Sequence, residues 1–448
     1  MFQVEGDEST MRVGIVPSLN PSAGGVYQYT LTILEALAAL SQQGQEEEYI
    51  LFTRAEYEPL VANLNGVHWS QVSLQPPTFK EQVLDVLRIW VGEGWLRQAW
   101  RSMRQRTTRP DPERIRRRPE FAQWFKRHGV EWVLYTAPTA LSFEAGLPYV
   151  MPVHDLQHRL QPEFPEVSAN GGWERREYLF RNGTRYATLI LADSEVGKED
   201  ILEFYGPYGV TPDRVKVLPF LPANYLSVDV PESGRVRVRQ AYRLPERYLF
   251  YPAQFWPHKN HARIVQALGL LKEEGGDEIH VVFCGSYTGE IREQTFQEAM
   301  TLAHRLGVTH QVHYLGYVPD KDMSGLYAEA VSLVMPTFFG PTNIPILEAW
   351  AFGCPVLTSD IRGVREQVGD AGLLVDHRSV EAIAEGIYRL WTSEALRREL
   401  IERGRQRLAR YTPEDFRRRL ADIIQEAKER AREGKCPVDA LSNALHSA

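Results

Sequence analysis

Residues 340–355, Gly-Pro-Thr-Asn-Ile-Pro-Ile-Leu-Glu-Ala-Trp-Ala-Phe-Gly-Cys-Pro, decide how the second half of this chain folds. The apolar run 332–336 in front of them predicts a buried strand, and the apolar spacing from residue 344 onward predicts a helix. A strand, a turn of Gly, Pro, Thr and Asn, and a helix direct backbone N–H groups to one point, where the helix dipole favours an anion. Glu348 lies early in the helix, where it either complements the dipole or accepts hydrogen bonds from a ribose.

The same alternation of strands and helices extends in both directions from this stretch. Strands are predicted at 12–16, 49–53, 130–135, 148–153, 188–192 and 215–219, and then at 248–253, 279–284, 312–315, 332–336, 355–358 and 372–375. Such alternation is typical of parallel, doubly wound sheets. We therefore predict an α/β protein with two Rossmann-like domains that face each other across a cleft.

The domain boundaries follow from a change of pattern between the two halves. Residues 220–246 contain prolines and little periodicity, which predicts an interdomain linker. We predict an N-terminal domain over 1–225, a C-terminal domain over 226–412, and a final helical segment over 413–448 that crosses back to the N-terminal domain.

Size and composition exclude several classes of protein. The chain has 448 residues, 43% of them hydrophobic and 24% charged, which fits two soluble domains. The net charge of -7 argues against a general nucleic-acid binder. The three cysteines form no CxxC pair, so neither disulfides nor zinc are expected. The first ten residues are acidic and lack an apolar core, and no apolar run could span a membrane, so a cytoplasmic location is expected.

One basic segment departs from this acidic background. An insertion over about 75–128 carries arginines from 88 to 127 with Trp90, Trp95, Trp100 and Trp124 among them. This pattern fits either a solvated insertion on a soluble enzyme or a basic amphipathic helix on an anionic membrane surface. A peripheral position at the inner face of a membrane is therefore a second expectation. No nucleic-acid-binding motif accompanies the patch.

Polar residues follow the predicted strands at the edge where open α/β sheets place ligand chemistry. In the first half these are Gly24, Gly25, His154, Asp155 and Ser194. In the second half they are Gln254, Lys259, Gly285, Gly340, Thr342, Asn343 and Glu348. Lys259 is a point charge that suits a phosphate, and with the turn and Glu348 it predicts a nucleoside-diphosphate site. His154, Asp155 and His158 lack a further ligand by spacing, so no metal is expected.

The motifs at these positions resemble those of retaining glycosyltransferases with the GT-B fold, in the large group called GT4. The matching pieces are GGVYQYT, the HD at 154–155, ADS, PAQFWPHKNH, FCGS, VHYLGYVP and NIPILEAWAFGCPVLTSDI. The resemblance extends over roughly 11–416 and is strongest over 251–375. It implies that Lys259 contacts the donor phosphates, Glu348 the ribose, and the turn up to Ile344 the phosphate and sugar. It also implies that the loop at Gly24 and Gly25 approaches the diphosphate and that His154 lies by the transferred sugar.

Two residues depart from the family pattern. The family has paired glutamates eight positions apart, and eight positions before Glu348 stands Gly340. An arginine common near the phosphates is replaced here by Gln254. The sugar contacts of the missing acid must pass to backbone groups or to Asn343, or be lost, and one positive charge is absent.

The resemblance implies a hexose transferase that uses a UDP- or GDP-sugar without metal or cofactor and retains the anomeric configuration. A mannosyl- or glucosyltransferase is expected, with His154, Lys259 and Glu348 as catalytic residues and Asp155 and Ser194 on the acceptor side. The acceptor, whether a glycan, a lipid-linked sugar or a small molecule, stays open. Alternatives are a sugar-nucleotide-binding protein that has lost catalysis, or a nucleotide-sugar epimerase or phosphorylase on the same fold.

Overall fold

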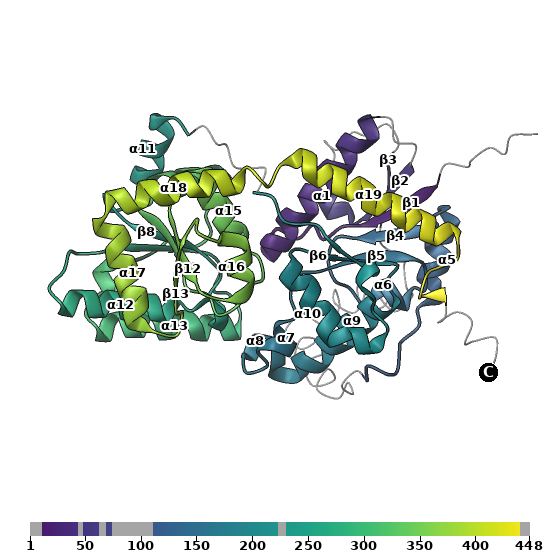
Figure 1. Cartoon of the computed structure of the whole chain (residues 1–448), viewed down its shortest axis with the longest axis horizontal. Helices are drawn as coiled ribbons and strands as arrows, with labels where there is room; N and C mark the ends of the chain where they lie inside the picture. The colour runs from purple at the N-terminus through teal and green to yellow at the C-terminus, as the bar shows by residue number, and fades with distance from the viewer. Residues whose placement is uncertain (1–10, 44–47, 62–68, 74–110, 223–229, 440–448) are drawn as a thin grey trace, which may run out of the picture.

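The computed structural model describes residues 11–43, 48–61, 69–73, 111–222 and 230–439 (Figure 1). These residues form two parallel sheets, each covered by helices, and the two halves lie side by side. The predicted α/β class with two Rossmann-like sheets is confirmed.

The sheet of the first half has seven strands in the order β3-β2-β1-β4-β5-β6-β7. All of its paired strands run parallel. The strands are β1 Arg12–Val16, β2 Glu48–Thr53, β3 Trp69–Ser73, β4 Trp132–Tyr135, β5 Tyr149–Val153, β6 Leu189–Ala192 and β7 Val215–Val217. The central strands are buried end to end, as expected where helices cover both faces.

The sheet of the second half has six strands in the order β10-β9-β8-β11-β12-β13, again all parallel. The strands are β8 Leu249–Pro252, β9 Val281–Cys284, β10 Val312–Tyr314, β11 Ser332–Met335, β12 Val356–Ser359 and β13 Leu373–Val375. The strand order reverses between β8 and β11, and β11 leads into the turn 340–343. A parallel sheet binds ligands at such a reversal, outside the carboxyl ends of its strands.

Helices connect the strands in both halves. The first half contains α1 Gly25–Gln42, α2 Glu58–Val61, α5 Pro119–Arg127, α6 Leu141–Glu144, α7 Gln157–Leu160, α8 Pro165–Ser168, α9 Gly172–Tyr186 and α10 Glu195–Tyr205, with short 3-10 turns at η1 Pro21–Ala23, η2 Ala55–Tyr57, η3 Ala169–Gly171, η4 Gly206–Tyr208 and η5 Pro212–Arg214. The second half contains α11 Glu232–Ala241, α12 His261–Glu273, α13 Glu290–Arg305, α14 Asp320–Glu329, α15 Ile344–Ala351, α16 Arg362–Val368, α17 Val380–Thr392 and α18 Glu394–Leu408, with η6 Pro257–Lys259 and η7 Thr309–Gln311.

The last long helix, α19 Pro413–Arg432, leaves the second half and lies along the first (Figure 1). The Thr412 hydroxyl caps it by accepting the N–H of Asp415 at 3.1 Å. Its Phe416 is buried, with a ring centroid 6.5 Å from that of Tyr29 on α1. Burying such an aromatic side chain contributes about 2 kcal/mol, so α19 joins the halves by an apolar contact as well as by the chain.

Two features differ from the sequence-based expectations, and a third expectation falls largely outside the described residues. The expected linker 220–246 contains the helix α11, in which Val238 is the one buried side chain and packs against Gly325 of α14. Because only one of its side chains is buried, the sequence of α11 shows no apolar periodicity from which a helix could be predicted. Strand β3 was not expected, because its sequence WSQVS is largely polar. Most of the basic segment 88–127 lies outside the described residues.

The described end of the basic segment belongs to the core of the first half. Phe125 of α5 is fully buried, and Trp124 packs on Phe52 of β2 with 4.6 Å between ring centroids. The aromatic face of α5 is therefore directed at the sheet and is not offered to a surface.

Candidate functional site

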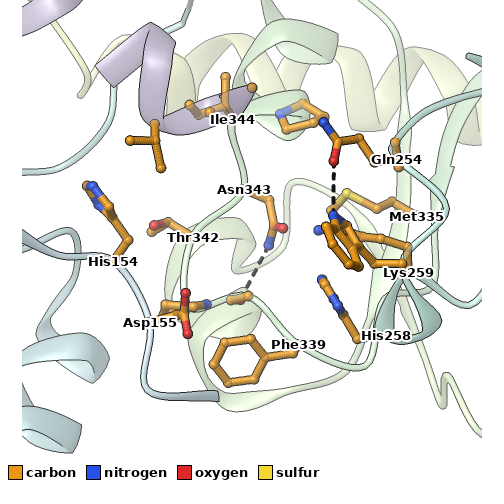
Figure 2. Close-up of a pocket in the computed structure, with 18 of the residues that line it drawn as sticks. His154, Asp155, Gln254, His258, Lys259, Met335, Phe339, Thr342, Asn343 and Ile344 are labelled. Carbon is orange, nitrogen blue, oxygen red and sulfur yellow. Dashed lines mark hydrogen bonds between the residues drawn. The ribbon is translucent and has the colours of Figure 1, made fainter. Parts of the chain in front are cut away.

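A cavity of about 370 Å³ lies between the two halves, at the carboxyl ends of both sheets. The first half contributes residues 23–26, His154, Asp155, Gln157, Asp193 and Phe220 to its lining. The second half contributes residues 252–254, Trp256, His258, Lys259, Met335 and 339–345. Figure 2 shows His154 and Asp155 on one side of the cavity and Gln254 and Lys259 on the other, with Thr342 and Asn343 between them.

Lys259 ends the 3-10 turn η6 and lines the cavity. The next residue, Asn260, has a left-handed backbone with φ of 64°, and its side-chain amide donates to the carbonyls of Pro336 at 2.7 Å and His377 at 2.8 Å. These bonds tie the η6 loop to the ends of β11 and β13. Burial lowers the pKa of Lys259 to about 8, against the opposing effect of Asp155 and Glu166. Lys259 is therefore charged at pH 7 in a position where an anion is the favoured partner.

The turn 340–343 is built around Asn343. Its amide Nδ2 donates to the Gly340 carbonyl at 3.3 Å, and its backbone N–H and C=O pair with the Gln367 side chain, each at 2.9 Å. Gly340 has φ of 142°, and a Cβ at this position would lie 2.7 Å from Asn343 Oδ1. The turn therefore requires glycine at 340 for two independent reasons, backbone conformation and space. The family's first glutamate cannot occupy this position while Asn343 keeps its conformation.

His154 follows β5 and packs between two aromatic rings. Its ring centroid lies 4.9 Å from that of Tyr29 in an edge-on contact and 5.6 Å from that of Phe220. Burial lowers the pKa of His154 to about 4, so the imidazole is neutral at pH 7. Its Nε2 has no hydrogen-bond partner within the part of the chain that the structure describes. The neighbouring Asp155 forms a salt bridge with Arg176 that, together with other partners, lowers the pKa of the carboxyl although burial would raise it.

Two carboxylates link the halves across the cavity, and neither was among the residues predicted to form the site. The Thr342 hydroxyl donates to Asp193 Oδ2 at 2.6 Å, and burial raises the pKa of Asp193 to about 7 against that hydrogen bond. Glu166 of α8 accepts from His258 Nδ1 at 2.7 Å. Asp193 was visible in the ADS motif, whereas Glu166 had no sequence signal because its partner lies 92 positions away.

A second set of contacts joins α10 to α16 beside the cavity. The Glu366 carboxylate accepts the backbone N–H groups of Glu195 at 2.9 Å and Val196 at 2.8 Å, which cap the start of α10 from the other half. Arg362 pairs with Asp200 at 2.7 Å. These bonds hold the two walls of the cavity at a defined separation.

The structure brings most of the predicted site residues to the cavity, and three of them do not line it. Gly285 directly follows β9 and does not line the cavity, and a Cβ there would lie 2.5 Å from the Ala253 carbonyl oxygen. Ser194 caps α10 by accepting the N–H of Gly197 at 2.9 Å. Glu348 is buried in α15 and accepts the Tyr327 hydroxyl at 2.6 Å. Their predicted contacts with donor or acceptor stay predictions.

Neither a metal cluster nor a membrane-spanning helix is found in the described part of the chain. Among those residues no group of three or more His, Cys, Asp or Glu side chains is placed to hold a metal ion. Within the same ranges, no helix combines the length and apolar character needed to cross a bilayer.

With the cavity described, comparison with known proteins defines its class. Residues 235–407, which run from within α11 to the last turn of α18 and contain the whole second sheet, match the family model described as glycosyl transferases group 1. This part of the chain is similar to that family, and the chain as a whole has the GT-B fold.

Relatives agree with this assignment. The chain is 31% identical over 220 residues to the O-antigen chain mannosyltransferase B of Escherichia coli, covering 49% of this chain and 55% of that protein. It is 30% identical over 257 residues to a D-inositol 3-phosphate glycosyltransferase of Corynebacterium urealyticum, covering 55% and 59%. The matches therefore span only about half the length of these relatives.

A solved structure extends the likeness over both halves. The crystal structure of Anabaena Alr3699/HepE in complex with UDP-glucose superposes with a TM-score of 0.65 and 17% identity, covering 93% of this chain and 99% of that one. At this identity the likeness establishes the shared fold.

Proposed function

We propose that this protein transfers a hexose from a nucleoside-diphosphate sugar to a hydroxyl acceptor, with retention of configuration and without a metal ion. The observation that carries the proposal is the cavity, in which Lys259 and the 340–343 turn of one half face His154 of the other. A mannosyl or glucosyl donor is favoured, because relatives include a mannosyltransferase and a neighbouring structure holds UDP-glucose.

The chemistry proposed needs no nucleophilic side chain. The bond between the sugar C1 and the diphosphate oxygen breaks while C1 bonds to the acceptor oxygen on the same face. The acceptor proton passes to the departing phosphate oxygen. Lys259 stabilises the charge that develops on this diphosphate, because an ammonium group in a partly dehydrated site interacts strongly with it. Neutral His154, whose Nε2 is unpaired among the described residues, is placed to hydrogen-bond a sugar hydroxyl without adding charge.

The competing function is that of a sugar-nucleotide-binding protein, because the family's first glutamate is absent. The geometry of the turn speaks against a degraded site. Gly340 and Asn343 fit each other closely, and the Gln367 side chain hydrogen-bonds to both the backbone N–H and the backbone C=O of Asn343. Three specific hydrogen bonds hold the turn in one conformation, which is not expected of a site that has decayed. We therefore favour a working enzyme with altered polar contacts to the sugar.

The first experiment identifies the donor by thermal shift with UDP-, GDP- and ADP-sugars, since a bound donor raises the melting temperature by mass action. Transfer and hydrolysis are then followed with the radiolabelled sugar nucleotide that binds. Lys259→Ala should weaken nucleoside-diphosphate binding roughly tenfold or more, the cost of losing a charge-assisted contact. Unchanged affinity in this variant would remove Lys259 from the site. Binding without transfer or hydrolysis across an acceptor panel would favour the binding protein.

A further inference from the structure

Gln254 stands where the family commonly has a positively charged arginine, and the structure shows what accompanies this exchange. Its carboxamide Oε1 accepts the Arg292 Nη1 group at 2.8 Å and the Trp256 Nε1 group at 3.0 Å. Gln254 and Trp256 both line the cavity. A carboxamide oxygen repels a phosphate, and here that oxygen is engaged by two donors.

Arg292 reaches this place from the first turn of α13 Glu290–Arg305, 38 positions along the chain from Gln254. Its guanidinium carbon lies 4.7 Å from the ring centroid of Trp256, within cation–π distance. Arg292 forms no salt bridge with any residue that the structure describes, whereas Arg176 of the first half and Arg362 of the second half are paired with carboxylates. Its positive charge is therefore not neutralised by a neighbouring acid and lies one layer behind the lining.

We infer that Arg292 is a positioning residue of the proposed donor site. It orients the Gln254 amide and supplies, from α13, the second positive charge that the diphosphate meets beside Lys259. The inference rests on the proposed function, because it assigns a ligand to the cavity. The positive charge that is absent at position 254 is thus supplied by Arg292 of α13, whose guanidinium donates a hydrogen bond to the Gln254 side chain.

The test uses the full chain and isothermal titration with UDP, GDP and ADP and with the matching monophosphates. For the diphosphate that the wild type binds, Arg292→Gln should raise the dissociation constant about tenfold, since charge-assisted contacts are strong. The effect on the monophosphate should be under about threefold, because the second phosphate group is what the guanidinium senses. Arg292→Lys, which keeps the charge and loses the planar fork, should fall between.

Two further variants separate charge from structure. Arg305→Gln removes an exposed arginine from the last turn of the same helix and should bind like the wild type. In the double variant Gln254→Arg with Arg292→Gln, the charge returns to the lining, and diphosphate affinity should recover to within about threefold of the wild type.

The outcomes distinguish the two proposals. A wild type that binds none of the three diphosphates overturns the proposed function and this inference with it. A wild type that binds one of them, with Arg292→Gln unchanged, overturns the inference alone. Equal loss of mono- and diphosphate binding in Arg292→Gln, with no recovery in the double variant, would show a merely structural role and also overturn it.

Discussion

Replacing Lys259 by methionine should separate the cost of burying this charge from its use in binding. Methionine keeps a similar length and removes the ammonium group. Because burial lowers the pKa of Lys259 to about 8, the folded protein disfavours the charged form. We therefore expect the unliganded Lys259→Met variant to be more stable than the wild type at pH 7 and to be stabilised less by nucleoside diphosphates.

The magnitude follows from the pKa. A fall from the ordinary 10.5 to about 8 corresponds to about 3 kcal/mol at roughly 1.4 kcal/mol per tenfold change. The side chain keeps some contact with water, which reduces the expected gain to about 2 kcal/mol. The folded pKa is below the unfolded value, so the cost is fully present below about pH 8. It shrinks as the pH rises from about 8 to 10.5 and is absent above that range.

The assay is urea unfolding of both proteins at pH 7 and pH 9.5, without ligand and with a nucleoside diphosphate at about one hundred times its dissociation constant. At that excess a ligand adds about 2.7 kcal/mol to the wild type, and it should add about 1.4 kcal/mol or less to a variant that binds at least tenfold more weakly. Lys321→Met, at an exposed position on α14, is the control and should change stability by less than about 0.5 kcal/mol. The reasoning fails if Lys259→Met is less stable than the wild type at pH 7, or if the ligand stabilises both equally.

Four other results are expected. Gly340→Glu, which restores the family's acid, should lower turnover and stability, because the position needs positive φ and has no room for a Cβ; higher transfer rates would contradict the geometry. Asn343→Ala should lower kcat more than it raises the Kd for the nucleotide, if Asn343 contacts the sugar and not the phosphates; an effect on affinity alone would place it elsewhere. Transfer should survive EDTA, and loss that manganese or magnesium reverses would show a metal requirement. Because of the basic segment 88–127, the full chain should float weakly with anionic vesicles, and added salt should reduce this binding; equal flotation with neutral and anionic vesicles at low salt would indicate a solvated insertion.

The strands and their parallel class were accessible from local pattern. Runs such as 189–192 and 281–284 are apolar throughout because helices cover both faces of the sheet, and this pattern survives without any knowledge of neighbours. Strand β3 and helix α11 escaped because their burial is slight and is decided by what packs beside them. Local pattern therefore identified the buried strands of both sheets and missed the edge strand β3 and the helix α11.

Most of the loop residues that the sequence predicted to form the site line one cavity, because the carboxyl ends of parallel strands lie at the same edge of a sheet. Lys259, His154 and Asn343 are examples, and they come from different strands. Two of the exceptions have partners elsewhere: Ser194 caps its own helix, and Glu348 accepts the hydroxyl of Tyr327 on α14. A polar residue after a strand can cap the following helix, bond to a neighbouring helix or line the cavity, and only the tertiary structure distinguishes these.

By itself the sequence determined the α/β class, the two sheets and the residues that end their strands, since these depend on periodicity over a few positions. Tertiary structure alone decided the pairs that span the cavity. Thr342 meets Asp193 across 149 positions, and Arg292 meets Gln254 across 38. Such pairs arise because the crossovers and the contact between the halves bring distant side chains to one edge. The pKa values and charge interactions of these residues depend on such tertiary contacts, which local sequence pattern does not reveal.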